Sequence, residues 1–522
     1  MRSVIVLGII PVLCLLAVNV QSGPEGQFFA TTATEAVDKI VLDSDGGASK
    51  NTAFQPKFKV SKKTTHKIPP GQQFTFGYLE VLENRSRPKG RTIEIPVYIF
   101  QSRSTDPKPD PIIYTVGGPG ASTMPSAPYM NYYQYLDERD FILIEQRGNY
   151  YAKPHLDCPE WSKAVYTSNL PDFDPGESDS LFERAAKACR QQLTAAGIDL
   201  NQYNTNAIAA DINDLVEVLD IEQYNLLTIS YSTKIAQVLM RDYPRRIRSV
   251  VMDSPLPLAV NYDEESVGNL LRSVGALLYD CASDPACEAA FPDLKERFYR
   301  YLREKTRHPL EVSVPHPQSG KLETFRLQGK DLITVFSSAS TGTVNEVPYE
   351  INKLLNGDLR SLQEQLSALF EPAGSGAGMG MRLSVWCAEE YPFNDYGRIK
   401  AETNRFPEVA SLSPAVFDAS ICDIWGVEKV PDQENQAIRS DIPVLLINGE
   451  YDNETPPQWA AAMQENLSNS YHLIFKGWMH TPTTNWGNPC AMEVANAFFN
   501  TPTEMPDNPC FEAIGNPKFK LE

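Results

Sequence analysis

The chain has 522 residues, 42% of them hydrophobic and 22% charged, a balance that indicates a folded globular protein and excludes a disordered or low-complexity one. It carries 47 Lys and Arg against 66 Asp and Glu, a net charge of −19, which argues against a protein that tracks nucleic-acid phosphates. At this length we expect two or three lobes rather than one small domain.

The first residues predict export. Met1 and Arg2 precede an apolar run, residues 4–18, which is shorter than the ~20 residues that span a bilayer. Polar residues follow, and small side chains suit cleavage before Gly23. We therefore expect a signal peptide over residues 1–22, a secreted or periplasmic protein, and no stable membrane span after cleavage. An uncleaved N-terminal anchor is the alternative.

The cysteine pattern fits an oxidising compartment. Cys14 lies within the apolar run, which leaves eight cysteines, and an even number in an exported chain favours disulfides. No CxxC pair is present and no His lies at ligand spacing, so we predict no metal site. The grouping of the cysteines favours neighbouring pairs: Cys158 with Cys189, Cys281 with Cys287, Cys387 with Cys422, and Cys490 with Cys510.

The strand pattern begins at about residue 75, after a polar leader (residues 23–74) that we expect to pack on the main body. Short apolar strands then alternate with helical stretches, which indicates an α/β protein with a mainly parallel sheet covered on both faces. The expected strands are Phe76–Val81, Thr92–Phe100, Pro111–Val116, Phe141–Ile144, Tyr224–Ile229 and Arg248–Met252.

This strand pattern disappears over residues 261–439, which are mostly helical in periodicity. It returns at Ile442–Ile447 and Tyr471–Phe475. A core in two parts, residues 75–260 and 440–522, split by an inserted helical cap, fits this pattern better than tandem domains do.

A serine lies where an apolar strand runs directly into a helix. In Thr228-Ile229-Ser230-Tyr231-Ser232, the serine has the position of the nucleophile in the G-x-S-x-G turn of α/β-hydrolases. Thr228 and Ser232 replace both glycines. Because serine is also a common first residue of a helix, this pentapeptide alone does not identify a nucleophile.

A glycine-rich turn follows an earlier strand. In Gly117-Gly118-Pro119-Gly120, backbone N–H groups can point at a developing oxyanion, together with the N–H of Tyr231. An ordinary Gly-Pro turn is the alternative interpretation.

An acid and a base follow in the order that this fold requires. Asp452 comes just after a predicted strand, and His480 follows the next one. The order Ser230, Asp452, His480, each at a strand end, is that of the α/β-hydrolase triad. The other five histidines precede the serine, lie in the inserted region or alternate within a strand: His66, His155, His308, His316 and His472.

On these residues the sequence resembles the secreted branch of the proline iminopeptidase and tripeptidyl aminopeptidase group of α/β-hydrolase serine peptidases. The resemblance covers most of residues 75–515. The chain departs from the pattern at Thr228 and Ser232, and at Val116, where the family often has His. The matching segments are Gly117–Gly120, Glu145–Gly148, Asp211, Ser230–Tyr231, Ser384–Glu390, Gly449–Pro457, His480, Cys490–Ala491 and Cys510.

The resemblance implies a serine exopeptidase that needs no cofactor and acts on peptides with free N-termini through an acyl-enzyme. It implies that Glu389 or Glu390 in the cap holds the substrate's ammonium group, with solvated glutamates at a helix end as the alternative. Arg147 is expected to brace its loop through an ion pair. Two other functions stay open: a carboxylesterase on the same scaffold, and a non-catalytic binding protein with this fold. The oligomeric state is not predicted.

Overall fold

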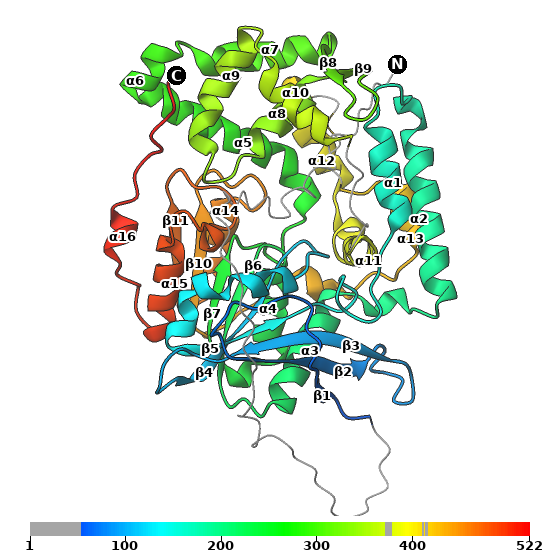
Figure 1. Cartoon of the computed structure of the whole chain (residues 1–522), viewed down its shortest axis with the longest axis vertical. Coiled ribbons are helices and arrows are strands. Elements are labelled where there is room, and N and C mark those ends of the chain that lie inside the picture. Colours follow the sequence, from blue (N-terminus) through cyan, green and yellow to red (C-terminus); the bar gives the residue numbers. More distant parts are fainter. Residues whose placement is uncertain (1–53, 371–377, 410–411, 413–415) are drawn as a thin grey trace, which may run out of the picture.

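A computed structural model describes residues 54–370, 378–409, 412 and 416–522 (Figure 1). The predicted signal peptide and most of the predicted leader lie outside the described residues. Within the described part, none of the helices has the length and apolar character that crossing a membrane requires.

The centre of the molecule is a nine-stranded sheet in the order β1-β2-β3-β5-β4-β6-β7-β10-β11. Strands β4, β5, β6, β7, β10 and β11 run parallel to one another, and β1, β2 and β3 add an antiparallel edge. The strands are β1 (Lys57–Val60), β2 (Phe74–Leu82), β3 (Thr92–Phe100), β4 (Lys108–Thr115), β5 (Arg139–Ile144), β6 (Tyr224–Ile229), β7 (Ile247–Asp253), β10 (Val444–Gly449) and β11 (Ser470–Phe475).

Each face of this sheet packs on its own hydrophobic core. Ile113 of β4 contributes to one core and its neighbours Ile112 and Tyr114 to the other, as the alternation of side chains in a strand requires. Helices α3 (Thr205–Val218), α4 (Ser232–Asp242) and α14 (Pro457–Gln464) cover the first face, and α15 (Cys490–Asn500) covers the second. The short α16 (Pro509–Glu512) follows α15.

Between β7 and β10 the chain forms a segment that we call the cap. Part of it packs around a third hydrophobic core, separate from those on the two faces of the sheet. The cap lies above the sheet in Figure 1, with helices α1 (Pro159–Ser168) and α2 (Ser178–Ala195) of the β5–β6 connection beside it. The elements of this segment are α5 (Tyr262–Ser283), α6 (Pro285–Ala290), α7 (Leu294–Arg307), β8 (Leu310–Pro315), β9 (Leu322–Leu327), α8 (Gly329–Ser337), α9 (Val347–Leu355), α10 (Arg360–Ala368), α11 (Met379–Glu389), α12 (Tyr396–Asn404) and α13 (Ala419–Trp425). Of these, α11 and α13 pack into the core of the first sheet face rather than into the separate core of the cap.

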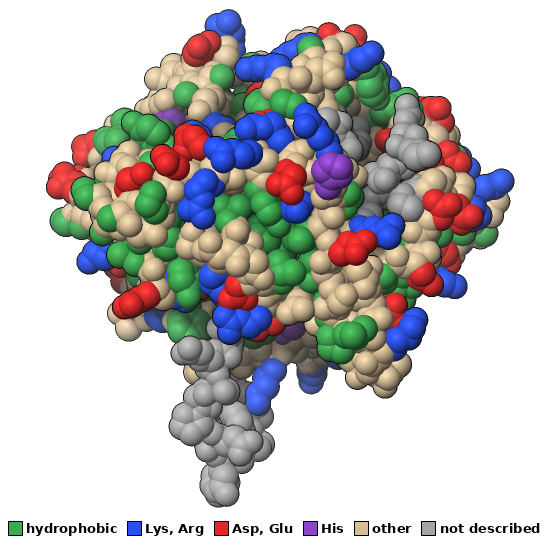
Figure 2. All heavy atoms as spheres, turned by 90° about the horizontal axis from the view of Figure 1, so that it is seen from above, with side chains coloured by type: hydrophobic (Ala, Val, Ile, Leu, Met, Phe, Trp, Pro, Cys, Tyr) green, Lys and Arg blue, Asp and Glu red, His purple; other side chains and the backbone are tan. Residues whose placement is uncertain are grey.

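The surface seen from the cap side carries mixed charge. Figure 2 shows Lys and Arg side chains interspersed with Asp and Glu, with hydrophobic side chains between them near the middle of this face. This face therefore presents no continuous field of one sign.

The four disulfides are those expected from the grouping of the cysteines. Their Cα–Cα separations are 5.1 to 5.7 Å. The bond Cys387–Cys422 joins α11 to α13 within the cap, and Cys490–Cys510 ties α15 to α16.

Candidate active site

Ser230 occupies a sharp turn between β6 and α4. Its φ is +57°, in the left-handed region that a non-glycine residue adopts only under strain. The turn is fixed by a hydrogen bond of 2.9 Å from the Ser230 N–H to the carbonyl of Asp253, at the end of the neighbouring strand β7. This is the backbone geometry that a nucleophile elbow requires.

The two residues that replace the usual glycines make hydrogen bonds within the elbow. The Ser232 hydroxyl accepts a bond of 2.8 Å from the Ile229 N–H and lies 2.8 Å from the carbonyl of Thr115. The Thr228 hydroxyl donates to the carbonyl of Val251 at 3.3 Å. Both side chains are buried, and both hydroxyls have hydrogen-bond partners. The elbow therefore accommodates these substitutions.

The glycine-rich turn packs directly against the elbow. A Cβ atom on Gly117 would lie 2.7 Å from the Cβ of Ser230 and 2.9 Å from the backbone nitrogen of Tyr231, so only glycine fits there. Gly118 follows with a φ of +116°, a conformation that favours glycine. The three predicted oxyanion-hole residues are therefore neighbours in space.

The segment that follows β5 holds this turn in place. Glu145 accepts a bond of 2.8 Å from the Thr123 N–H, and Gln146 donates to the carbonyl of Val116 at 2.5 Å. The Asn149 side chain donates a hydrogen bond of 2.6 Å to the carbonyl of Ala121. Burial raises the pKa of Glu145 to about 7, although hydrogen bonds to its carboxylate oppose the rise. In the sequence, residues 145–148 stand out only as a match to the family. Their role in holding the glycine-rich turn becomes visible only in the structure.

Arg147 makes its ion pair with Asp211 of α3. Its Nε and Nη2 atoms each lie 2.7 Å from a carboxylate oxygen of Asp211, and both residues are buried. The guanidinium also donates to the carbonyls of Glu83 and Gln202. The bracing role expected for Arg147 thus has a partner 64 residues further along the chain.

Replacing Arg147 with Met is expected to lower the free energy of unfolding by about 1.5–3 kcal/mol, because the buried Asp211 carboxylate loses the charged hydrogen bonds from Arg147 and keeps its ion pair with Arg85. Urea unfolding followed by circular dichroism measures the loss. The matched control is Arg87→Met, at an exposed position. A loss equal to that of the control would show that the pair contributes little.

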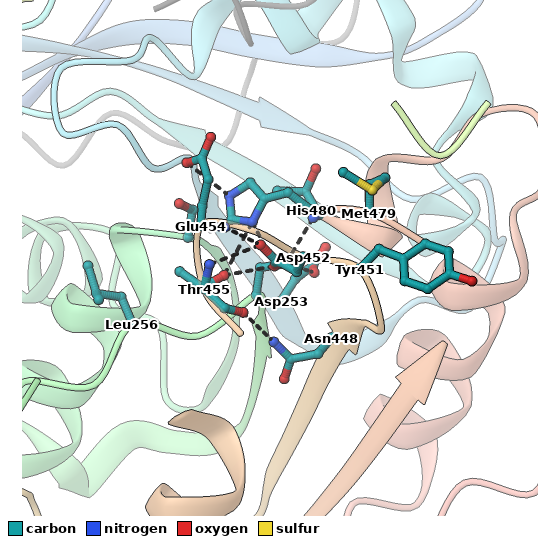
Figure 3. Close-up of polar contacts among 12 residues, drawn as sticks. Asp253, Leu256, Asn448, Tyr451, Asp452, Glu454, Thr455, Met479 and His480 are labelled. Carbon is teal, nitrogen blue, oxygen red and sulfur yellow. Dashed lines mark hydrogen bonds and ion pairs between the residues drawn. The ribbon is translucent and has the colours of Figure 1, made fainter. Parts of the chain in front are cut away.

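The predicted acid and base are hydrogen-bonded to each other. Oδ2 of Asp452 lies 2.8 Å from Nδ1 of His480 (Figure 3). Oδ1 of Asp452 accepts bonds of 2.9 Å from the N–H groups of Glu454 and Thr455. Burial alone would raise the pKa of Asp452, but the attraction of His480 and these hydrogen bonds hold it below its usual value. Asp452 is therefore a fixed carboxylate that orients the imidazole.

The imidazole of His480 lies among several carboxylates. Its Nε2 atom is 3.9 Å from Oε2 of Glu454. Burial disfavours the charged ring, but Asp452, Glu454 and Asp253 outweigh it and raise the pKa of His480 to about 9. In the described part of the chain the Ser230 hydroxyl and His480 are not hydrogen-bonded, and such bonds are often long in ligand-free enzymes.

The end of β7 links the serine loop to the histidine loop. The Asp253 carbonyl accepts from the Ser230 N–H, while its carboxylate accepts from the N–H and hydroxyl of Thr483 at 2.8 and 2.5 Å. The adjacent Ser254 hydroxyl accepts from the Thr481 N–H at 2.8 Å. Asp253 was not a sequence candidate, although its place at a strand's carboxyl end could have suggested it.

Replacing Thr483 with Val is expected to lower kcat/KM about tenfold, because the histidine loop loses one of its bonds to Asp253 and small displacements of a catalytic group are costly. Steady-state hydrolysis measures the loss. Thr483→Ser, which keeps the hydroxyl, should retain nearly full activity. Equal activity of the two variants would show that this bond does not position His480.

The two glutamates expected to bind an ammonium group are buried. Glu389 accepts from the N–H and hydroxyl of Thr205 at 2.6 and 2.5 Å, and burial raises its pKa to about 7. Glu390 forms an ion pair with Lys234 and accepts from the Tyr262 N–H at 3.1 Å. The alternative of solvated glutamates at a helix end is therefore wrong, and both carboxylates have partners inside the protein.

Among the described residues, no group of three or more His, Cys, Asp or Glu side chains is arranged to hold a metal ion. The arrangement around Ser230 consists of a hydroxyl, an imidazole, a carboxylate and backbone N–H groups. These groups can perform nucleophilic acyl transfer by themselves.

Comparisons with known proteins show which families and relatives the chain resembles. Residues 110–318 match the α/β-hydrolase fold model, and residues 411–510 match the model of TAP-like proteins. The chain is 22% identical over 462 residues to serine protease Hip1 of Mycobacterium tuberculosis, covering 83% of this chain and 86% of the relative. It is 26% identical over 448 residues to the tripeptidyl aminopeptidase of Streptomyces coelicolor, covering 79% and 78%.

Among solved structures, the proline iminopeptidase of Mycobacterium smegmatis is 16% identical, with a TM-score of 0.34 and coverage of 79% of this chain and 96% of that one. The chain has the α/β-hydrolase fold, as its sheet and the matched model show. Within that class it is a serine hydrolase, and its predicted resemblance to the tripeptidyl aminopeptidase group is confirmed.

Proposed function

We propose that the protein is an exported serine exopeptidase that hydrolyses peptide bonds near free N-termini. The observation that carries this proposal is the Asp452–His480 hydrogen bond on loops that meet the strained Ser230 turn at the end of β7. The names of the relatives, a serine protease and a tripeptidyl aminopeptidase, support peptides as the substrate class.

In the proposed mechanism, neutral His480 accepts the hydroxyl proton of Ser230 as its Oγ atom attacks the scissile carbonyl. The N–H groups of Tyr231 and of the Gly117–Gly118 turn bind the oxyanion, a contribution of about 3 kcal/mol per donor. His480 then gives the proton to the leaving amine, which departs with the C-terminal part of the peptide. Water, deprotonated by His480, hydrolyses the acyl-enzyme and frees Ser230.

The cap restricts the site to chain ends in this proposal. Its residue Gly378, just before α11, packs on the glycine-rich turn so closely that a Cβ on Gly120 would lie 2.4 Å from the Gly378 carbonyl oxygen. Glu389 and Glu390, at the end of α11, are the anchors predicted from the sequence for the substrate's ammonium, but each would have to give up an internal partner to bind it.

Digestion of defined peptides, followed by mass spectrometry, tests this function. Peptides with a free N-terminus should lose N-terminal residues one step at a time, while N-acetylated copies should stay intact. Turnover of small esters without cleavage of any peptide would favour the carboxylesterase. A folded protein that cleaves neither would favour the non-catalytic binding protein.

A further inference from the structure

We propose that Glu454 binds the α-ammonium group of the substrate, and that this contact switches His480 from an idle acid to an active base. The inference rests on the proposed function and deepens it. A free N-terminus would then serve two purposes, since it anchors the substrate and activates the group that deprotonates Ser230.

The position of Glu454 is the first observation. Asp452 engages Nδ1 of His480, which leaves Nε2 to face the Ser230 proton, and Oε2 of Glu454 is 3.9 Å from that same Nε2 atom (Figure 3). The Glu454 N–H donates to Oδ1 of Asp452 at 2.9 Å, so the catalytic acid itself fixes the backbone that carries this second carboxylate. Glu454 therefore borders the place where the acyl part of a substrate must lie.

The carboxylate of Glu454 is also available. Its side chain is 24% exposed. Within the described residues its oxygens have no hydrogen bond, and the distant contact with His480 is their one ion pair. Glu389 and Glu390 differ in this respect, because both are buried against internal partners. An ammonium can thus pair with Glu454 without displacing any group of the protein.

The charges around His480 are unbalanced. The ring faces three carboxylates: Asp452 and Glu454 on the loop after β10, and Asp253 at the end of β7. Two arginines of the cap region oppose them: Arg272 of α5 donates to the carbonyl of Asp452, and the charge of Arg382 of α11 attracts that of Glu454.

This negative surround favours the protonated ring at neutral pH, in line with the pKa of about 9 for His480. A protonated imidazole cannot accept the Ser230 proton, so the protonated fraction of the free enzyme is inactive in this proposal. An ammonium on Glu454 cancels one carboxylate charge and places a positive charge near the ring, and both effects lower the pKa of His480. The ring then releases its Nε2 proton to solvent and becomes the base.

The same geometry limits how much of the peptide is released. An ammonium within about 3 Å of Oε2 lies within about 7 Å of Nε2. Each residue between the ammonium and the scissile carbonyl adds roughly 3.5 Å in an extended chain. Because the scissile carbon can lie about 4 Å further from the ammonium than Nε2 does, we expect release of at most about three residues per cleavage.

The test compares wild type, Glu454→Gln and the control Glu465→Gln, which removes the same charge at an exposed position. The substrates are alanine p-nitroanilide, its N-acetyl derivative and p-nitrophenyl acetate, a neutral ester that reports the triad alone. For wild type and the control, kcat/KM on the ester should rise with pH to an apparent pKa near 9. For the free amine substrate, the pKa seen in kcat should lie at least one unit lower.

Glu454→Gln should lower the apparent pKa on the ester and so increase its hydrolysis at pH 7. It should also lower kcat/KM on the free amine substrate at least tenfold relative to the N-acetyl derivative, the loss expected for one charged hydrogen bond. An unchanged preference and an unchanged pH profile would overturn this inference while leaving the peptidase intact. If wild type turns over the ester but cleaves neither anilide nor any of the defined peptides with free N-termini, the proposed function itself fails.

Discussion

Replacing Ser230 with Ala is expected to lower kcat by about 10⁶, to the level left by binding and the oxyanion hole alone. The elbow holds Ser230 at a φ of +57° between β6 and α4, and the neighbouring hydroxyls of Thr228 and Ser232 are bonded inside the elbow, away from its position. The measurement is single-turnover hydrolysis of a peptidyl arylamide.

The control for this variant is Ser338→Ala, at an exposed helix end, which should retain full activity. Circular dichroism should show both variants folded, because alanine at position 230 removes only one oxygen. A Ser230→Ala protein with more than a hundredth of wild-type activity would contradict the assignment of the nucleophile.

Replacing Asp452 with Asn is expected to lower kcat about 10⁴-fold. An amide can accept the bonds from the N–H groups of Glu454 and Thr455 that now reach Oδ1 of Asp452. Its NH₂ group would then face Nδ1 of His480, which stabilises the wrong tautomer of the ring. The protein should therefore fold normally and lose the base that deprotonates Ser230.

The expected loss at Asp452 also has a pH signature. Removing this carboxylate takes away the strongest attraction that raises the pKa of His480, so the residual activity should reach its plateau at lower pH than in wild type. Asp441→Asn, which changes an exposed carboxylate before β10, is the matched control. A loss below tenfold, or an unchanged pH profile, would show that Asp452 does not serve as the acid.

Much of the core could be predicted because its strands are short, apolar and bounded by helices. Strand β6 is buried along its whole length and coincides with the predicted Tyr224–Ile229, and β10 was predicted within two residues. Ser230, Asp452 and His480 could be predicted for a related reason. Each follows a strand whose position the sequence predicts, and the order along the chain is restricted by the fold.

Other features depend on contacts that no local pattern encodes. Strand β1 reads as part of a polar leader, because Lys57–Val60 gains its stability from pairing with β2 rather than from burial. The hairpin of β8 and β9 lies in a region whose periodicity is mostly helical. The predicted boundaries of the cap (residues 261–439) and of the leader (residues 23–74) stay predictions.

The same limit applies to the site. Three contacts of the site join positions far apart in the chain. Arg147 and Asp211 are 64 residues apart, Asp253 and Thr483 are 230 apart, and Glu454 and His480 are 26 apart. Glu389 and Glu390 show the converse: sequence identifies the residue type, but only the packing shows that both carboxylates already have partners.

The most direct test of the central claim is covalent labelling of the folded protein with a fluorophosphonate, followed by peptide mass mapping. The account predicts one adduct per chain, on Ser230, formed faster as pH rises toward 9 because neutral His480 must deprotonate the hydroxyl. An adduct on a different serine, or a folded protein that does not react at all, would contradict the account.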